Sequence, residues 1–278
     1  MGEVIAPPRI LSLSGGRTSS FLYENYSCDE AVFALVHNED PKCAHPDKGI
    51  WRQVQDRAGF DVIGTPEHYL TPKVILDLEQ RSGKQITWLA GDSFEQVIKN
   101  HGNALPNTGM RFCTTDMKLK PIFEHCYFKY GFVTMAVGYR HDEQERKESL
   151  VNTFEFPYCS NLYGQYRQKL REVEWRECET PLIDDVITSW HVNQYWAGQG
   201  VDFPPDSNCQ MCFWKDTAQL RKNFDDSPHV MQWAKRMEKQ TKRRFRRDIS
   251  MSSTERQGLQ LDFFYGTGAG CKAGECMN

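Results

Sequence analysis

A glycine pair flanked by hydroxyl side chains lies near the start of the chain, in the stretch R-I-L-S-L-S-G-G-R-T-S-S over Arg9–Ser20. The apolar residues before the glycines predict a short strand, and Phe21–Tyr26 after them predict an amphipathic helix. A turn of this kind directs several backbone N–H groups and the positive end of the helix dipole at one point. An ordinary glycine turn before a helix is the alternative. We predict a phosphate site made by Ser12, Ser14, Gly15, Gly16, Arg17, Thr18 and Ser19.

A second charged motif lies at the end of a predicted strand in F-V-T-M-A-V-G-Y-R, residues 132–140. Arg140, Glu143 and Arg146 recur there at intervals of three residues. The guanidinium fork of arginine suits two-point binding of a tetrahedral anion. We predict that the two arginines contact a phosphate or sulfate group and that Glu143 orients one of them. A solvated, charged start of a helix is the alternative.

Three cysteines have the spacing of metal ligands. Cys209 and Cys212 form C-x-x-C, and Cys113 lies in R-F-C-T, five residues before Lys118. Thiolates bind zinc and iron–sulfur clusters equally well by type, so the spacing leaves the metal open. Three buried apolar cysteines are the alternative.

Taken in order, these motifs resemble those of the PAPS reductase-like family, within the PP-loop adenine-nucleotide α-hydrolase superfamily. S-G-G-R-T-S is similar to the PP-loop, G-Y-R-H-D-E-Q-E-R to an arginine motif of that family, and the cysteine layout to its iron–sulfur members. The cysteines are also similar to those of DNA-phosphorothioation sulfur-transfer ATPases. The resemblance runs from about Ile10 to Lys215 and is strongest to phage and bacterial PAPS-reductase-like proteins. A Walker A loop is excluded, because its lysine is absent.

The resemblance implies a set of ligands and site residues. The nucleotide is ATP or PAPS, with Mg²⁺ as a further candidate, and Asn38 and Lys118 join its site. The metal centre is a four-iron four-sulfur cluster, with zinc as the second choice. Thr114 stands where the reductases have another cysteine, so a ligand must come from elsewhere. The metal ligands are then Cys113, Cys209, Cys212 and Cys276, and the catalytic residues are Arg17, Arg140 and Cys276.

The resemblance also implies a function. We expect an ATP pyrophosphatase-type enzyme of sulfur metabolism that performs sulfur transfer or AMP-forming chemistry beside the cluster. A PAPS or APS reductase that uses a C-terminal cysteine thiol is one alternative. A non-catalytic nucleotide or nucleic-acid binding module, docking through the basic run Lys242–Arg247, is another. The expected partners are a small-molecule or nucleic-acid sulfur acceptor and a protein that donates sulfur or electrons.

The elements that must position these residues alternate between strands and helices, which predicts an α/β protein with a doubly wound, mostly parallel sheet. After the first strand we expect strands at Ala31–Asp40 and Phe60–Thr65, with a helix at Lys48–Ala58 between them. Residues 1–215 form the predicted PP-loop nucleotide-binding domain, of which 70–109 are an insertion. Residues 216–278 form a helical C-terminal region that ends in a glycine- and cysteine-rich tail.

Composition and charge further limit the classes of protein to which this chain could belong. The formal net charge of −3 argues against wholesale attraction to nucleic acid or membrane, although local patches remain open. No apolar run approaches the ~20 residues that span a bilayer, and the N-terminus does not read as a signal peptide. Ten cysteines in such a chain are expected to be ligands, reactive thiols or buried residues in a reducing compartment. We therefore predict a cytoplasmic protein without a membrane partner, and the sequence gives no indication of oligomeric state.

Overall fold

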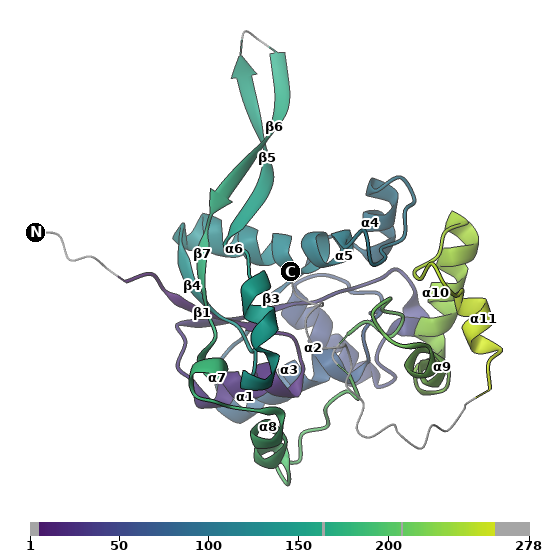
Figure 1. The fold of residues 1–278 in the computed structure, drawn as a ribbon, viewed down its shortest axis with the longest axis horizontal. Helices are drawn as coiled ribbons and strands as arrows, with labels where there is room; N and C mark the ends of the chain where they lie inside the picture. The colour runs from purple at the N-terminus through teal and green to yellow at the C-terminus, as the bar shows by residue number, and fades with distance from the viewer. Residues whose placement is uncertain (1–5, 163–164, 207, 259–278) are drawn as a thin grey trace, which may run out of the picture.

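The structure is a computed structural model that describes residues 6–162, 165–206 and 208–258, with the backbone alone for residues 157–169. A five-stranded sheet lies at its centre, in the order β3-β2-β1-β4-β7 (Figure 1). All four pairings in this sheet are parallel. This confirms the predicted α/β class with a mostly parallel sheet. The strands are β1 (Arg9–Leu13), β2 (Glu30–Ala34), β3 (Thr87–Leu89), β4 (Val133–Ala136) and β7 (Arg176–Glu179).

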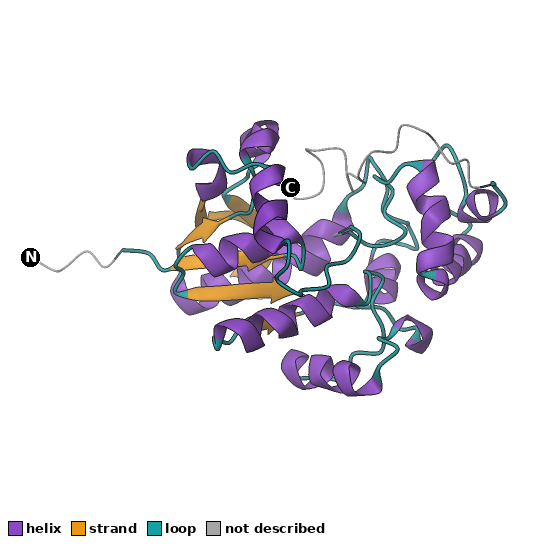
Figure 2. Cartoon of the chain, turned by 90° about the horizontal axis from the view of Figure 1, so that it is seen from below, coloured by secondary structure: helices purple, strands orange, loops and turns teal. Residues whose placement is uncertain are grey.

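Helices lie on both sides of the strands (Figure 2). One core cluster joins α1, α2, α3 and α8 to one face of the sheet, and another joins α6 to the opposite face. The helices are α1 (Arg17–Asn25), α2 (Lys48–Ala58), α3 (Leu70–Ser82), α4 (Phe94–Asn100), α5 (Phe112–Thr114), α6 (Lys120–Tyr130), α7 (Pro181–Asp184), α8 (Ser189–Trp196), α9 (Thr217–Asp226), α10 (Pro228–Thr241) and α11 (Met251–Glu255). Shorter helical turns are η1 (Pro41–Cys43), η2 (Thr115–Leu119) and η3 (His141–Ser149).

The ends of several helices follow directly from the sequence. The Asp47 carboxylate accepts the N–H groups of Gly49 and Ile50 and so begins α2, while Gly59 ends it with φ +75°. Asp216 begins α9 in the same way by accepting the Gln219 N–H at 2.7 Å. The predicted helix at Lys48–Ala58 is therefore confirmed, because its capping residues are local.

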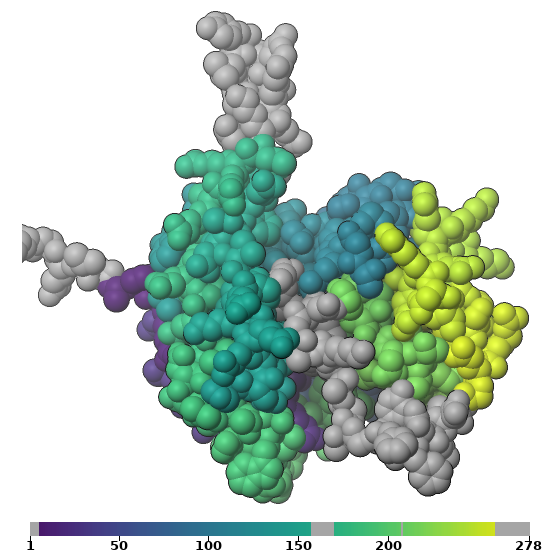
Figure 3. Space-filling model, in the orientation of Figure 1, coloured from purple at the N-terminus to yellow at the C-terminus, as the bar shows by residue number. Residues whose placement is uncertain are grey.

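A second core lies beyond the carboxyl ends of the strands. It combines Phe94, Val97 and Ile98 of α4 with apolar side chains of α9, α10 and α11. Figure 3 shows the yellow-green C-terminal segment against the blue segment that contains α4. Segments far apart in the sequence thus share one core, and Val36, just past β2, connects this core to the sheet.

A two-stranded antiparallel ribbon projects from the body of the molecule (Figure 1). It consists of β5 (Thr153–Leu162) and β6 (Gln165–Glu174). At its base, Phe154 and Phe156 lie against Phe123 of α6, with ring centroids 4.5 and 5.4 Å apart. Aromatic packing therefore fixes the root of the ribbon on the α6 face of the sheet.

Two predicted features take a different form. Phe60–Thr65 is wrong as a strand: only Gly64 pairs there, in an isolated bridge with Asn38, and β3 takes the place beside β2. The stretch 70–109, predicted as an insertion, contributes α3 and β3 to the sheet and its first core, and α4 to the second core. Short apolar runs such as 60–65 are ambiguous because period alone does not distinguish a strand from a buried extended loop.

No helix in the described part of the chain has both the length and the apolar character needed to cross a membrane.

Glu30 joins three elements at the amino-terminal edge of the sheet. Its carboxylate accepts hydrogen bonds from Thr87 of β3 and from Tyr130 of α6, and it pairs with His125 at 2.9 Å and Lys129 at 3.1 Å. Burial alone would raise the pKa of Glu30, but the hydrogen bonds from Thr87, Tyr130 and Lys129 together with His125 lower it to about 2. The ionised carboxylate is therefore favoured by the folded state.

We expect Glu30→Gln to lower the free energy of unfolding by about 2–3 kcal/mol at pH 7. A depressed carboxyl pKa contributes stability above the unfolded value, and that contribution is lost as pH falls. The difference between variant and parent should therefore shrink between pH 4.5 and pH 2. Urea unfolding over that range measures it, and a difference that stays constant would contradict the assignment.

Candidate functional site

The two predicted anion motifs lie side by side at the carboxyl edge of the sheet. β1 pairs with β2 on one side and with β4 on the other, so the chain changes direction across the sheet between β1 and β4. Open α/β sheets bind ligands in the crevice at such a switch point. The Arg140 guanidinium, after β4, donates to the Thr18 hydroxyl, at the start of α1, over 2.9 Å. The structure thus brings the two motifs into direct contact.

The glycine loop is shaped by Gly15 rather than by Gly16. Gly15 has φ +73°, and a Cβ added to it would lie 2.7 Å from Cγ2 of Thr71 on α3. Gly16, which precedes α1, has φ −92°, a conformation open to any residue. Gly15 is therefore required twice over, by its backbone conformation and by its close approach to α3.

The Ser19 hydroxyl forms hydrogen bonds with the backbone inside the glycine loop. The Ser14 N–H donates to Oγ of Ser19 at 3.2 Å, and the same Oγ donates to the Gly16 carbonyl at 3.2 Å. Ser19 is buried, and Gly138 after β4 passes so close that an added Cβ would lie 3.2 Å from the Cα of Ser19. The turn and the end of β4 therefore form one compact surface.

Glu143 holds both arginines of the second motif. Its carboxylate accepts from the Arg146 guanidinium at 2.8 Å and lies 3.3 Å from that of Arg140. Glu143 is buried, and the Arg146 guanidinium stacks 4.2 Å from the ring centroid of Tyr139. The three predicted residues are thus brought together, with Arg140 directed at the glycine loop.

Three further predicted residues lie around this edge in different ways. The Arg17 guanidinium donates to Asn193 of α8 at 3.1 Å and lies 5.5 Å from the ring centroid of Phe203, so it points toward α8. Asn38 is fully buried after β2, and its side-chain amide has no hydrogen-bond partner among the described residues. Ser12 is half-buried within β1 itself.

The three predicted metal cysteines line a single cavity of about 50 Å³. Cys113 precedes η2, and Cys209 and Cys212 come from the loop before α9. A water needs roughly 10–15 Å³ by this measure, so the cavity holds more than one small ligand. Burial, together with the neighbouring Cys212, raises the pKa of Cys113 to about 12. The thiols are therefore close enough to influence one another.

Lys118 and Glu67 form an ion pair beside these cysteines. The Lys118 ammonium donates to Oε1 of Glu67 at 2.8 Å, and the Glu67 side chain has no exposed surface. Burial disfavours the charged ammonium, but Glu67 and Cys209 hold the pKa of Lys118 above its ordinary value. The second oxygen of Glu67 has no hydrogen-bond partner among the described residues. Lys118, predicted to bind nucleotide, is thus placed at the cysteine cavity.

One short segment connects the glycine loop with the cysteine cavity. It runs from Thr65 to Thr71; Glu67 contacts Lys118, and Thr71 contacts Gly15. The Pro66 carbonyl accepts the N–H of Gln210, which lies within the C-x-x-C loop. We call residues 65–71 the connecting segment. Its fully buried Thr71 hydroxyl has no partner in the described part of the chain, which is consistent with a polar ligand at the loop.

Sequence reasoning missed both Glu67 and Thr71. The signal available for Glu67 was its position just after the predicted strand Phe60–Thr65, since functional groups follow strand ends in such sheets. No spacing motif linked it to Lys118, which is 51 residues away. For Thr71 we find no signal in the sequence.

A second buried ion pair, Lys215–Asp206, holds the two ends of the loop that contains C-x-x-C. The Lys215 ammonium contacts a carboxylate oxygen of Asp206, and the two side chains are 0% and 3% exposed. The other oxygen of Asp206 accepts from Gln219 at 2.9 Å, and the Lys215 carbonyl accepts from Arg246 at 2.6 Å. The loop is therefore held by fully desolvated charges that satisfy one another.

The donor set fits a thiophilic metal in its chemistry, because three thiols line one cavity. Within the described residues, however, no group of three or more His, Cys, Asp or Glu side chains is arranged so that it could hold a metal ion. Cys276, the predicted fourth ligand, lies outside the described residues, as does Cys271.

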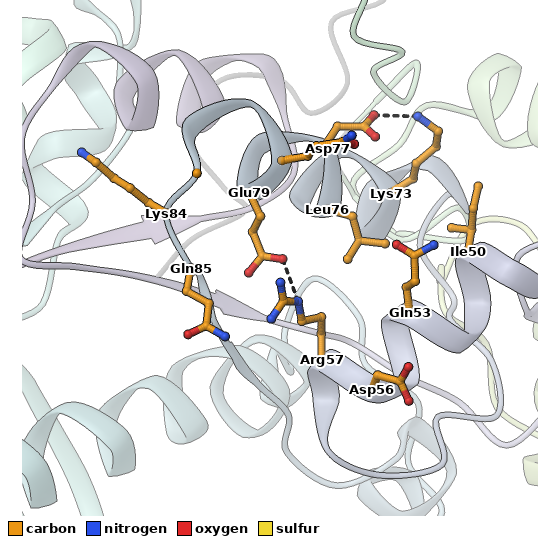
Figure 4. Close-up of a pocket in the computed structure, with 12 residues that line it drawn as sticks. Ile50, Gln53, Asp56, Arg57, Lys73, Leu76, Asp77, Glu79, Lys84 and Gln85 are labelled. Carbon is orange, nitrogen blue, oxygen red and sulfur yellow. Dashed lines mark hydrogen bonds and ion pairs between the residues drawn. The ribbon is translucent and has the colours of Figure 1, made fainter.

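A larger cavity of about 1100 Å³ lies between α2 and α3 (Figure 4). Some of the charged side chains that line it form ion pairs with one another. Arg57 pairs with Glu79 at 3.0 Å, and Lys73 pairs with Asp77 at 2.6 Å. None of the predicted site residues lines it. Size alone therefore does not mark the candidate site.

The fold and site together define an α/β protein in which two predicted anion motifs meet at the carboxyl edge of a parallel sheet. No family model matches the chain. It is similar to an uncharacterized nin region protein, ORF290, of Escherichia phage lambda, with 30% identity over 150 residues that cover 49% of each chain. The chain therefore spans about half the length of the curated relative it matches.

We expect Gly15→Ala to destabilise the protein by about 2 kcal/mol or more, because a Cβ at φ +73° is strained and meets Thr71. Gly16→Ala is the matched control, and it should cost less than about 1 kcal/mol. Urea unfolding of both variants measures the difference. Equal losses would show that the loop does not depend on the conformation of Gly15.

Proposed function

We propose that this chain is a PAPS reductase-like enzyme of the ATP-pyrophosphatase type. It binds an adenine nucleotide at residues 14–19 and performs sulfur-transfer or AMP-forming chemistry beside a cysteine-held iron–sulfur cluster. The proposal includes an adenine-nucleotide α-hydrolase-like fold, to which α9, α10 and α11 add a helical C-terminal extension.

The observation that carries this proposal is the contact between the glycine loop and Arg140 at the switch point of the sheet. The Arg140–Thr18 hydrogen bond unites two motifs that lie more than a hundred residues apart in the sequence. A phosphate there would meet the backbone N–H groups of the loop, the amino end of α1 and a guanidinium fork. This combination favours a nucleotide over a neutral ligand.

The chemistry suited to such a loop is the release of pyrophosphate. An oxygen of the acceptor attacks the α-phosphorus of ATP, pyrophosphate leaves, and a sulfur nucleophile then displaces AMP. The N–H groups of the loop and Arg140 stabilise the negative charge that grows on the departing pyrophosphate. Glu143 keeps Arg140 in place, since it lies 3.3 Å from that guanidinium.

The cysteine cavity supplies the second half of the proposal. Cys113, Cys209 and Cys212 would hold the cluster, and Lys118 would lie beside it as a balancing positive charge. When bound, an iron–sulfur cluster supplies an iron that can carry sulfur or an electron. The connecting segment places this cavity next to the glycine loop through Glu67 and Thr71.

Anaerobic incubation with ATP, PAPS or APS, scored for AMP, pyrophosphate and sulfite, tests the activity. We expect AMP and pyrophosphate from ATP, and Arg140→Gln should reduce their rate by roughly 10²-fold or more, as expected when one donor to a developing charge is lost. Arg52→Gln is the control, because Arg52 is an exposed arginine on α2 and belongs to none of the predicted site residues. Sulfite from PAPS without AMP from ATP would favour the reductase alternative. Unchanged nucleotide in every case would favour a binding module.

The metal content is tested separately on anaerobically purified protein. We expect iron and acid-labile sulfide in equal amounts and a brown colour, both lost in Cys209→Ser and in Cys212→Ser. Cys178→Ser, in β7 of the sheet, is the matched control and should retain both. Colourless protein with stoichiometric zinc would replace iron by zinc, and protein without either metal would contradict the assignment.

A further inference from the structure

A basic groove of about 550 Å³ lies on the C-terminal helices. It is formed by the last two turns of α10, the segment 242–250 and the start of α11. We call it the α10 groove. None of its residues belongs to the glycine loop or to the cysteine cavity. Six cationic side chains line it: Lys235, Arg236, Lys239, Lys242, Arg243 and Arg244.

The acid in the groove, Glu238, is attracted to Arg244 but forms no close ion pair there, because its oxygens are used by the backbone. Glu238 is buried, and its two carboxylate oxygens accept the backbone N–H groups of Phe245, at 3.2 Å, and Met251, at 2.8 Å. Phe245 and Met251 are themselves buried in the second core. The carboxylate therefore ties the basic segment to α10, and the cations lie on an ordered surface.

Most of the groove's positive charge lies outside the ion pairs that the described residues form. Arg236 pairs with Asp40, and Lys235 pairs with Glu255. Within the described residues no ion pair involves the other four, Lys239, Lys242, Arg243 and Arg244. All four are exposed. These four cationic side chains form a local positive surface on a chain whose formal net charge is −3.

We propose that the α10 groove binds the sugar–phosphate backbone of a nucleic acid. Arginine and lysine in a concave surface are the usual phosphate contacts of such proteins. A membrane surface is disfavoured, because interfacial binding also needs exposed apolar side chains. Among the described residues, no large exposed hydrophobic side chain lies in segment 228–258.

Two further arginines, Arg247 and Arg111, relate the basic segment to the cysteine cavity. A Cβ added to Gly109 would lie 3.3 Å from the guanidinium of Arg247, so Arg247 packs on the turn at 107–110. Arg111 follows that turn, lines the cysteine cavity and lies 5.6 Å from the ring centroid of Trp214. A chain bound in the groove would therefore find further cationic and aromatic surface along this path.

Binding of fluorescein-labelled 20-mers tests the proposal on the full-length protein, with single-stranded DNA, duplex DNA and single-stranded RNA as separate arms. Four exposed cations outside ion pairs predict that affinity falls about 50- to 150-fold between 50 and 200 mM salt, from a slope of roughly −2.8 for a single strand to roughly −3.6 for a duplex. Lys239→Gln/Arg243→Gln/Arg244→Gln should weaken binding by about 10-fold or more at low salt and reduce the slope to about −1. The arm that binds most tightly identifies the form of nucleic acid.

The matched control is Lys48→Gln/Arg52→Gln/Lys84→Gln, which removes three exposed positive charges elsewhere. It should retain the affinity and the salt slope of the parent. Equal losses in both triple variants, unchanged binding in the groove variant, or no binding of any 20-mer at 50 mM salt would each overturn the proposal. Equal binding to phosphatidylserine vesicles would also overturn it, in favour of a membrane. Thermal unfolding of the variants confirms that they fold, and none of these outcomes depends on nucleotide turnover.

Discussion

The parallel pairing of β1 with both β2 and β4 is the constraint on which the candidate site depends. Because all strands of the sheet run the same way, every connection must cross a face of the sheet, and helices therefore cover both faces. The carboxyl ends of neighbouring strands meet at one edge. The glycine loop and the Arg140 motif come together because β1 and β4 are neighbours, although long stretches of chain separate them.

The connecting segment adds a second constraint at this edge. It supplies Thr71 to the glycine loop and Glu67 to the cysteine cavity, so the two parts of the candidate site share one short stretch of backbone. Its threonine at position 65 donates to the Val36 carbonyl at 2.8 Å, which fixes the segment to the end of β2. A buried carboxylate such as Glu67 is tolerated because Lys118 lies 2.8 Å away, and removing one partner would leave the other charge uncompensated.

The sequence predicted the features that depend on local spacing. The glycine turn, the Arg140–Glu143–Arg146 repeat and the C-x-x-C each involve residues a few positions apart, so a motif suffices to find them. The helix at Lys48–Ala58 was equally accessible, because Asp47 and Gly59 mark its ends.

Contacts between distant segments were not accessible in this way. Glu67 contacts Lys118 and Thr71 approaches Gly15, and both partners lie more than 50 residues away in the sequence. The strand predicted at Phe60–Thr65 is wrong for a related reason: the position beside β2 is taken by β3, and only Gly64 pairs, in an isolated bridge with Asn38. Competition between segments for one sheet edge is decided by tertiary packing, and a single sequence does not record it.

The Lys215–Asp206 pair has a consequence for how this chain tolerates change. Both charged groups are shielded from water, so substituting either residue alone leaves the other charge buried and unpaired. Replacing both by apolar side chains of similar volume leaves no buried charge at all. Positions 206 and 215 are therefore expected to change together in evolution. A sequence that changes only one of them would pass through a less stable protein with an unpaired buried charge. Related sequences are therefore expected to show covariation between positions 206 and 215, because the effects of the two substitutions on stability are not additive.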